Sequence, residues 1–162
     1  MNVIDTVAEL ARDTEEDCRE VRTVDIAQRL AWLDRAAAAG SESAQADYVT
    51  RALGVLTDDP QAVVRNAEEI VRVKTDGIRY LEAAAARGNT RALFSLAIEY
   101  RGNVTVPPDK VLGLGYLLAL QQTGLAPDIG GPVARWSGEL SDDELARAHN
   151  QARRIFASCC AP

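Results

Sequence analysis

The chain is poor in aromatic residues, in basic residues and in histidine, and each shortage narrows what it can be. Phe, Trp and Tyr make up 5% of 162 residues, while alanine is abundant. That balance favours closely approaching helices over a sheet core of large side chains. The chain has 18 Lys and Arg and 24 Asp and Glu, which gives a formal net charge of -6. This sign is opposite to the positive charge with which proteins attract phosphates. We therefore expect no nucleic-acid partner.

Long hydrophobic runs are also missing. A helix that spans a bilayer needs about 20 apolar residues, and the densest stretch, residues 111–120, is shorter and contains two glycines. We expect a soluble protein without membrane insertion, cytoplasmic by default because the first residues resemble no signal peptide. Export stays open if a leader had been removed.

Cysteine is scarce and its spacing is uninformative. Cys18, Cys159 and Cys160 form no CxxC motif, so neither a zinc site nor a thioredoxin-like pair is indicated. With a single histidine, His149, we expect no metal site and no cofactor. The cysteines are interpreted as ordinary thiols, and a bridge from Cys18 to the terminal pair stays open for an exported protein.

What the chain does have is an internal repeat. AWLDRAAAAGSESA (31–44) aligns with RYLEAAAARGNTRA (79–92), and YLEAAAARG (80–88) aligns with YLLALQQTG (116–124). Each copy has an aromatic residue eight positions before a glycine. The aromatic positions are Trp32, Tyr80 and Tyr116, and the glycines are Gly40, Gly88 and Gly124. Such recurrence is typical of helical repeat proteins.

The repeat unit has a physical interpretation. We expect the aromatic residue to belong to a buried stripe and the alanines to let the next helix approach closely. Glycine, which has no Cβ, can take the left-handed conformation that ends a helix. Asn89 then suits the N-cap of a helix over 90–100, whose buried face would hold Ala92, Leu96, Ala97 and Tyr100.

Other boundaries follow from proline and from capping residues. Pro60 and the Pro-Pro-Asp sequence at 107–109 suit helix starts. The first predicts a long helix over 61–87, in which residues 74–77 form either a break or a polar face. Ser141 and Glu144 have capping-box spacing and predict a closing helix over 141–156. Its apolar stripe is Leu145, Ala148, Ala152 and Ile155.

Residues 78–124 resemble a Sel1-like repeat, a relative of the tetratricopeptide repeat, and residues 31–54 give a weaker match. The resemblance implies an all-α fold: one domain over 1–162, built as a short right-handed α-solenoid of stacked antiparallel helix pairs with atypical capping helices. The chain departs from the family in having Gly113 where alanine is usual and Ala97 in place of a glycine. We expect Gly113 and Gly115 to allow close helix packing and not to cradle a phosphate.

The same resemblance implies a binding surface, because the exposed face of the first helix in each repeat lines a concave side. On this basis the partner-binding candidates are Arg91, Ser95 and Glu99, with Asp47 and Arg51 one repeat earlier. A merely solvated face stays open as the alternative. Trp136 has no counterpart in the other repeats and could face either the core or a partner.

No nucleophile with an obvious base emerges from the sequence, and we interpret the acidic clusters as helix caps and His149 as a surface residue. We therefore expect a non-catalytic scaffold that binds a protein or peptide partner. An inhibitor or immunity-type protein that caps a specific partner is the alternative. A weak hydrolase of the β-lactamase-like kind is less favoured, because the repeated cysteine pairs of such Sel1-like proteins and a Ser-x-x-Lys motif are both absent.

Overall fold

The computed structural model describes residues 26–57, 60–102, 105–126 and 128–160. Within these residues the chain is all-helical, with eight helices and no strand. The helices are α3 (Ile26–Ala38), α4 (Glu42–Leu56), α5 (Pro60–Arg65), α6 (Ala67–Ala85), α7 (Thr90–Gly102), α8 (Lys110–Gln122), α9 (Gly130–Ser137) and α10 (Asp142–Cys159). The expected all-α class is confirmed.

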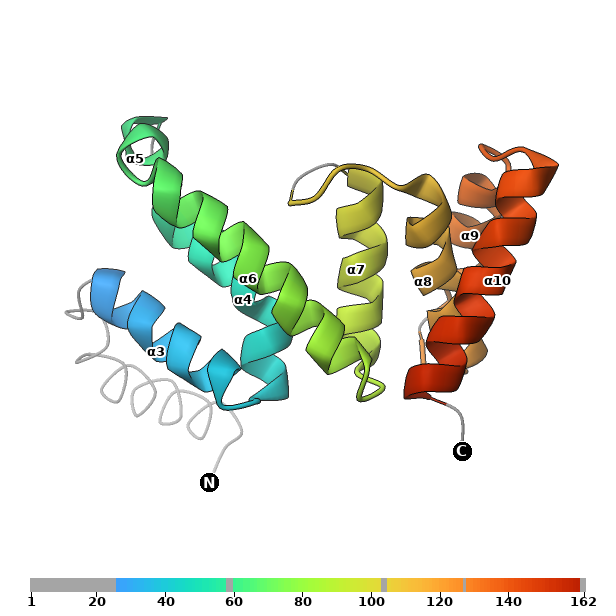
Figure 1. The fold of residues 1–162 in the computed structure, drawn as a ribbon, viewed down its shortest axis with the longest axis horizontal. Helices are drawn as coiled ribbons and strands as arrows, with labels where there is room; N and C mark the ends of the chain where they lie inside the picture. Colours follow the sequence, from blue (N-terminus) through green and yellow to red (C-terminus); the bar gives the residue numbers. More distant parts are fainter. Residues whose placement is uncertain (1–25, 58–59, 103–104, 127, 161–162) are drawn as a thin grey trace, which may run out of the picture.

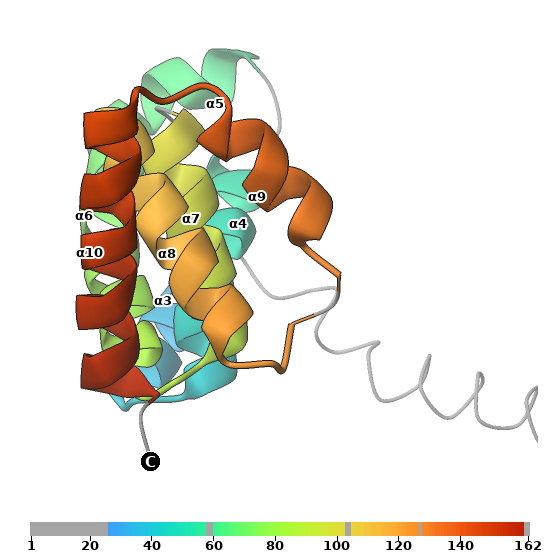
Figure 2. The same ribbon diagram turned by 90° about the vertical axis from the view of Figure 1, so that its right-hand side faces the viewer.

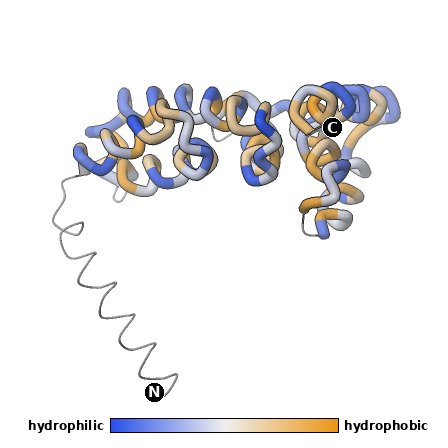
Figure 3. The backbone as a smooth tube through the Cα atoms, turned by 90° about the horizontal axis from the view of Figure 1, so that it is seen from below, coloured by the Kyte–Doolittle hydropathy of each residue, from blue (hydrophilic) through white to orange (hydrophobic). Residues whose placement is uncertain are grey.

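From α3 through α4, α6, α7 and α8 to α10, the helices follow one another across the molecule in chain order, while α5 lies at the same end as α3 (Figure 1). Helix α4 packs on α3 and on α6, and α7 packs on α6 and on α8. Helix α8 lies between α7 and α10, with α9 to one side (Figure 2). Hydrophobic and hydrophilic residues alternate along the whole array (Figure 3), and the buried residues form clusters that extend over successive helices. Neighbouring elements therefore supply most of each helix's packing.

Three glycines end helices in the way that the repeat predicts. Gly40, Gly88 and Gly124 have φ values of 88°, 80° and 67°, which only glycine adopts without strain. After Gly40 and Gly88, the amide of the next residue donates back to a carbonyl of the helix, as is typical of left-handed helix ends. Ser41 N–H donates to Ala36 O at 3.0 Å, and Asn89 N–H donates to Ala84 O at 3.2 Å. The predicted left-handed helix ends are confirmed.

The helix starts are capped by side chains. Asn89 Oδ1 accepts from Ala92 N–H at 3.0 Å, and Asp109 Oδ1 accepts from Leu112 N–H at 2.9 Å. Ser141 and Glu144 form the predicted capping box at the start of α10. Each cap satisfies an amide that has no partner within its own helix, so the cap at Asn89 and the closing helix are confirmed.

The long helix expected over 61–87 is instead two helices, with the break at Asn66 and not at residues 74–77. Asn66 Nδ2 donates to Leu56 O at 3.1 Å, which ties the break to the end of α4. Gly77 lies within α6 at the closest approach to α4, where a Cβ would overlap Val49 Cγ2. A polar sequence with a glycine therefore continues as helix because the glycine allows contact with α4.

Two groups of buried residues form the core. The N-terminal group lies between α3, α4 and α6 and consists of Ala37, Ala44, Tyr48, Ala52, Leu56 and Val73. The C-terminal group is larger and extends from Ile78 in α6 to Ala152 in α10. Helix α6 contributes to both groups, so it connects the two halves of the molecule.

Helix α8 is packed on two sides, and its two central glycines explain how. A Cβ on Gly113 would lie 3.0 Å from Ala97 O in α7, and a Cβ on Gly115 would lie 2.9 Å from Gln151 Cβ in α10. Both glycines are therefore in close contact with a neighbouring helix, as the sequence predicted.

The aromatic repeat positions differ in their surroundings. Tyr80 packs edge-on against Tyr48, with ring centroids 5.0 Å apart, and Tyr116 stacks on Tyr100 at 5.7 Å. Trp32 is 42% exposed, so its expected place in a buried stripe is wrong. The packed face of α3 holds residues 30, 33 and 37, and at 100° per residue Trp32 lies well away from that face.

None of the helices in the described part of the chain is long and apolar enough to cross a membrane.

Candidate interaction surface

Helices α4 and α7 bring three of the predicted binding residues together. Asp47 Oδ2 lies 3.0 Å from Arg51 Nη2 on the same helix, and Asp47 Oδ1 lies 3.2 Å from Arg91 Nη1 on α7. The Asp47 side chain is 12% exposed, whereas those of Arg51 and Arg91 are 63% and 68% exposed. One nearly buried carboxylate thus orients two guanidinium groups that remain open to solvent.

Two apolar side chains on α7 lie beside this charged group. Phe94 and Ile98 are each 42% exposed and are one helical turn apart. They lie on the side of α7 opposite to Leu96, which is fully buried. Exposed apolar side chains that cluster next to polar groups are typical of interaction sites. We call Asp47, Arg51, Arg91, Phe94 and Ile98 together the α4–α7 face.

An apolar pocket of about 300 Å³ adjoins this face. It lies between the start of α7, the end of α8 and the connector to α9, and Leu120 and Ile129 at its floor are buried. Its lining residues are Thr90, Arg91, Phe94, Leu120, Ala126 and Ile129. Because Phe94 lines the pocket and is also exposed, the pocket and the α4–α7 face are continuous. A concave apolar site with few polar groups suits an anchoring side chain.

The other predicted residues of α7 point away from the α4–α7 face. Ser95 and Glu99 are half-buried, and Glu99 accepts a hydrogen bond from the Thr105 hydroxyl. Eight residues of an α-helix rotate the side-chain direction by about 80° relative to the start, so Arg91 and Glu99 do not share one direction. The structure brings Arg91 into the face and places Glu99 at its edge.

Trp136 belongs to the core, so it offers no surface to a partner. It is 5% exposed, and the guanidinium carbon of Arg101 lies 4.4 Å from its ring centroid. Arg101 also pairs with Glu139 at 2.5 Å and thereby lowers the pKa of that carboxyl. Of the two alternatives for Trp136, the core or a partner-facing surface, the structure shows the core, where Arg101 makes a cation–π contact with its ring.

A second, polar groove lies between the start of α8 and α10. It has a volume of about 780 Å³, and its cationic lining residues are Lys110, Arg147 and Arg154. Two carboxylates in the groove already serve as caps, Asp109 for α8 and Glu144 for α10. His149, on the same helix, is exposed as predicted. This groove is basic within an acidic chain, but it lacks the apolar anchor site found at α7.

The most strongly shifted ionisable groups lie elsewhere, in the packing of α3, α4 and α6. Burial raises the pKa of Tyr48, and the hydrogen bond from its hydroxyl to Asp34 raises it further. Arg72 pairs with Asp34 at 2.9 Å and with Glu69 at 2.6 Å, and it lowers the pKa of Glu69. This arrangement joins α3, α4 and α6, and Asp34 and Glu69 also line a pocket of about 380 Å³ beside it.

The described ranges contain no group of three or more His, Cys, Asp or Glu side chains placed to hold a metal ion. No protein-family model matches the chain, and no curated protein matches it. The α4–α7 face and its pocket are therefore the features of the described residues from which a function is inferred.

Proposed function

We propose that the chain is a non-catalytic interaction module that binds a protein or peptide partner through the α4–α7 face and the pocket beside it. We also propose that its helices form a short right-handed α-solenoid of the Sel1-like kind, with atypical helices at its ends. Successive packing of neighbouring helices and the three left-handed glycines at equivalent repeat positions support this arrangement.

The exposure of Phe94 and Ile98 beside an apolar pocket is the observation that supports this function most strongly. Their neighbours Leu93 and Leu96 are fully buried, so α7 has enough apolar side chains for its own packing without these two. Removing exposed apolar surface from water releases about 25 cal/mol per Å². A partner that covers both side chains and fills the pocket would gain this energy at a few central contacts, as protein interfaces usually do.

The charges around the pocket indicate which partner would fit. Arg51 and Arg91 both approach Asp47, so two positive groups share one negative group and the site has a local excess of one positive charge. Both arginines are mostly exposed, and each guanidinium can donate hydrogen bonds to a further carboxylate. We infer that the partner segment has an apolar anchor residue next to an acidic one, presented by a helix or an extended peptide.

Substitutions on α7 test this proposal. The variant carries Phe94→Ser and Ile98→Ser, and the control carries Val71→Ser, which replaces a 64% exposed apolar residue on α6. Proteins retained by the immobilised wild-type chain are identified, and the affinity of each purified protein for the three chains is then measured by calorimetry. Loss of two central apolar contacts should weaken binding by about 10- to 100-fold, or ~1.4 to 2.8 kcal/mol.

Urea unfolding of the same three chains provides the folding control. The expected result is loss of affinity in the α7 variant alone, with both variants unfolding cooperatively as wild type does. A partner that binds the folded α7 variant and wild type equally would contradict the assignment of this face. A partner lost equally from the Val71 control would place the interface on α6.

A further inference from the structure

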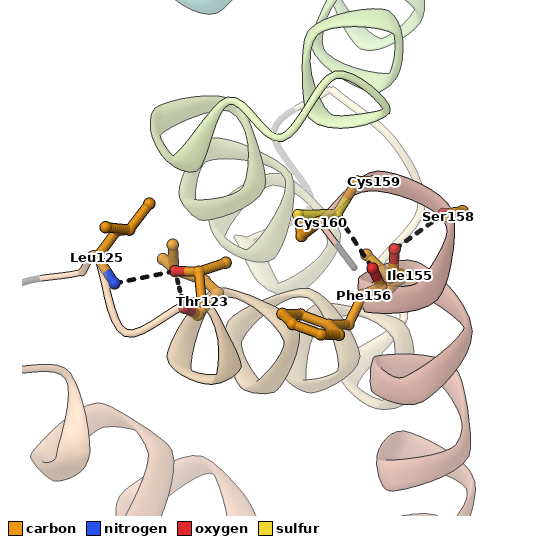
Figure 4. The surroundings of a disulfide bond; sticks show 8 residues. Thr123, Leu125, Ile155, Phe156, Ser158, Cys159 and Cys160 are labelled. Carbon is orange, nitrogen blue, oxygen red and sulfur yellow. Dashed lines mark hydrogen bonds between the residues drawn. A yellow bond between two sulfur atoms is a disulfide. The ribbon is translucent and has the colours of Figure 1, made fainter. Parts of the chain in front are cut away.

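The last turn of α10 carries a disulfide between neighbouring residues, Cys159 and Cys160 (Figure 4). The expectation of ordinary thiols is therefore wrong for this pair, while Cys18 lies outside the described residues. Ile155, Phe156 and Ser158 precede the pair on the helix, and both cysteines pack against the C-terminal core.

This bridge is poorly suited to stabilise the fold. A disulfide stabilises a protein mainly by closing a loop between distant residues and so restricting the unfolded chain. Cys159 and Cys160 are one residue apart, so their bond closes no such loop. The helices of this chain already pack along their lengths without the help of this bond. A bond between two adjacent cysteines therefore points to a chemical function.

The two sulfur-bearing residues have different surroundings. Cys159 lines a small pocket of about 100 Å³ together with Glu82, Tyr116 and Ser158. Cys160 faces the turn between α6 and α7, where its Sγ lies 3.8 Å from the position a Cβ would take on Gly88. Both are half-buried. Both cysteines pack against the turn at Gly88, and Cys159 in addition borders a pocket.

We propose that Cys159 and Cys160 form a reversible thiol–disulfide exchange site for low-molecular-weight thiols, with Cys159 Sγ as the point of attack. A disulfide that borders a pocket can be reached by a small thiol, and exchange proceeds through a mixed disulfide. A thiolate attacks Cys159 Sγ, the bond between the two cysteine sulfurs breaks, and Cys160 Sγ leaves as a thiolate that takes a proton from water.

A second thiolate then attacks the small-molecule sulfur of the mixed disulfide. It releases the oxidised small-molecule disulfide, and Cys159 leaves as a thiolate that is protonated by water. In total, two small thiols are oxidised and the bridge receives two electrons and two protons. The reverse reaction with an oxidised small-molecule disulfide closes the bridge again.

The helix end can accommodate the reduced form. Cys159 Sγ lies 3.9 Å from Phe156 O, one turn earlier on α10. A disulfide sulfur has no proton to donate, but a thiol at this position can donate weakly to that carbonyl. The amide of Cys160 already donates to the same carbonyl at 2.9 Å. Opening the bridge therefore adds a local hydrogen bond and leaves the last turn of α10 intact.

The test uses a chain with Cys18→Ser, so that the third cysteine cannot take part. The protein is oxidised with glutathione disulfide, then incubated with or without millimolar glutathione, alkylated with N-ethylmaleimide and weighed by mass spectrometry. We expect no alkylation before thiol treatment, two alkyl groups after it, and unchanged helical circular dichroism. Two alkyl groups without thiol treatment, or a bridge that stays closed in millimolar glutathione, would overturn the proposal.

Single variants in the same background test the point of attack. Cys160→Ser leaves the Cys159 thiol, and Cys159→Ser leaves the Cys160 thiol, so the two chains differ in which sulfur is free. We expect the Cys159 thiol to be alkylated about tenfold faster, because thiol reactivity follows access as well as thiolate character. Equal rates, or a faster Cys160 thiol, would refute attack at Cys159. Matching circular dichroism spectra show that both chains are folded.

Discussion

The two halves of this molecule hold their helices together by different interactions. Between α3, α4 and α6, Arg72 bonds to Asp34 across helices and to Glu69 and Asp76 within α6, and Tyr48 donates to Asp34. Between α7, α8 and α10, apolar side chains and two glycines of α8 fill the contacts. The N-terminal half has a small core with a polar clamp, and the C-terminal half has a larger, closely packed one.

The difference shows that a repeated sequence pattern fixes where helices begin and end more firmly than it fixes what lies between them. Gly40 and Gly88 end equivalent helices with nearly the same φ. Tyr80 nevertheless meets Tyr48 beside an ionic network, while Tyr116 meets Tyr100 beside an apolar core. Three pairs of substitutions and one change of pH test these two modes of packing.

The largest expected effect comes from truncating a buried leucine in each half. Leu117 is fully buried in the C-terminal core, and Leu56 is 3% exposed in the N-terminal one. We expect Leu117→Ala to lower the free energy of unfolding by about 3–5 kcal/mol and Leu56→Ala by ~2–3 kcal/mol, because a closely packed site relaxes less. Urea unfolding measures both. Equal losses, or a larger loss at Leu56, would remove the contrast between the two cores.

Adding one methyl group to α8 has the next largest effect. Gly113→Ala should lower the free energy of unfolding by about 1–2 kcal/mol, because its Cβ would meet Ala97 O. Gly54→Ala is the matched control on α4, where no atom of the described residues lies within 4 Å of the added carbon. There the better helix propensity of alanine should raise stability by about 0.5–1 kcal/mol. A gain of stability at Gly113 would show that α7 and α8 are less tightly packed than described.

Alkaline pH should destabilise both halves through their tyrosines. Burial, followed by nearby Glu82, raises the pKa of Tyr100 to about 12, and burial also raises that of Tyr48. A raised folded pKa means that the stability is fully present below the unfolded value near 10 and is lost as pH rises through the folded value. For Tyr100 the loss should be about 1 kcal/mol per pH unit between roughly 10 and 12.

Thermal unfolding at several pH values measures this dependence. Tyr100→Phe and Tyr48→Phe should each flatten the decline above pH 10, and a variant with the wild-type slope would show that its tyrosine does not contribute.

The smallest effect is expected at the polar clamp. The Arg72 side chain is 43% exposed, so solvent screens its ion pairs and Arg72→Gln should cost about 1 kcal/mol or less at low salt. Arg79→Gln is the control, since Arg79 pairs with Asp76 and contacts the Tyr80 ring but is 69% exposed. We expect the Arg72 effect to shrink in 1 M salt and the Arg79 effect to be smaller throughout. A loss of stability in Arg72→Gln that does not depend on salt would indicate that the methylene groups of Arg72 stabilise the fold by packing, and not its charge.

Much of the fold was predictable from the sequence because local chemistry determines it. Glycine at 40, 88 and 124 ends helices, and Asn89 and Ser141 start them, through bonds within a few residues. Trp32 was placed wrongly because its burial depends on which side of α3 is covered, and the repeat pattern contains no signal for that. The break at Asn66 was missed for a similar reason, since its bond to Leu56 O joins residues ten positions apart.

The candidate site was predictable in part. Asp47, Arg51 and Arg91 were identified by their positions in the repeat, and the structure brings them together. Phe94 and Ile98 were missed because the candidates on this helix were chosen among its polar residues. Plotting α7 at 100° per residue places them opposite Leu96, and this signal could have identified them. The pocket depends on the α8–α9 connector, which no repeat position specifies.

Hydrogen exchange of the protein with and without its captured partner locates the binding surface. Binding at the α4–α7 face and its pocket predicts slower amide exchange in residues 90–102 and at the connector that follows α8, with little change in α10. Protection confined to α10 and the basic groove beside it, with α7 unaffected, would contradict the account.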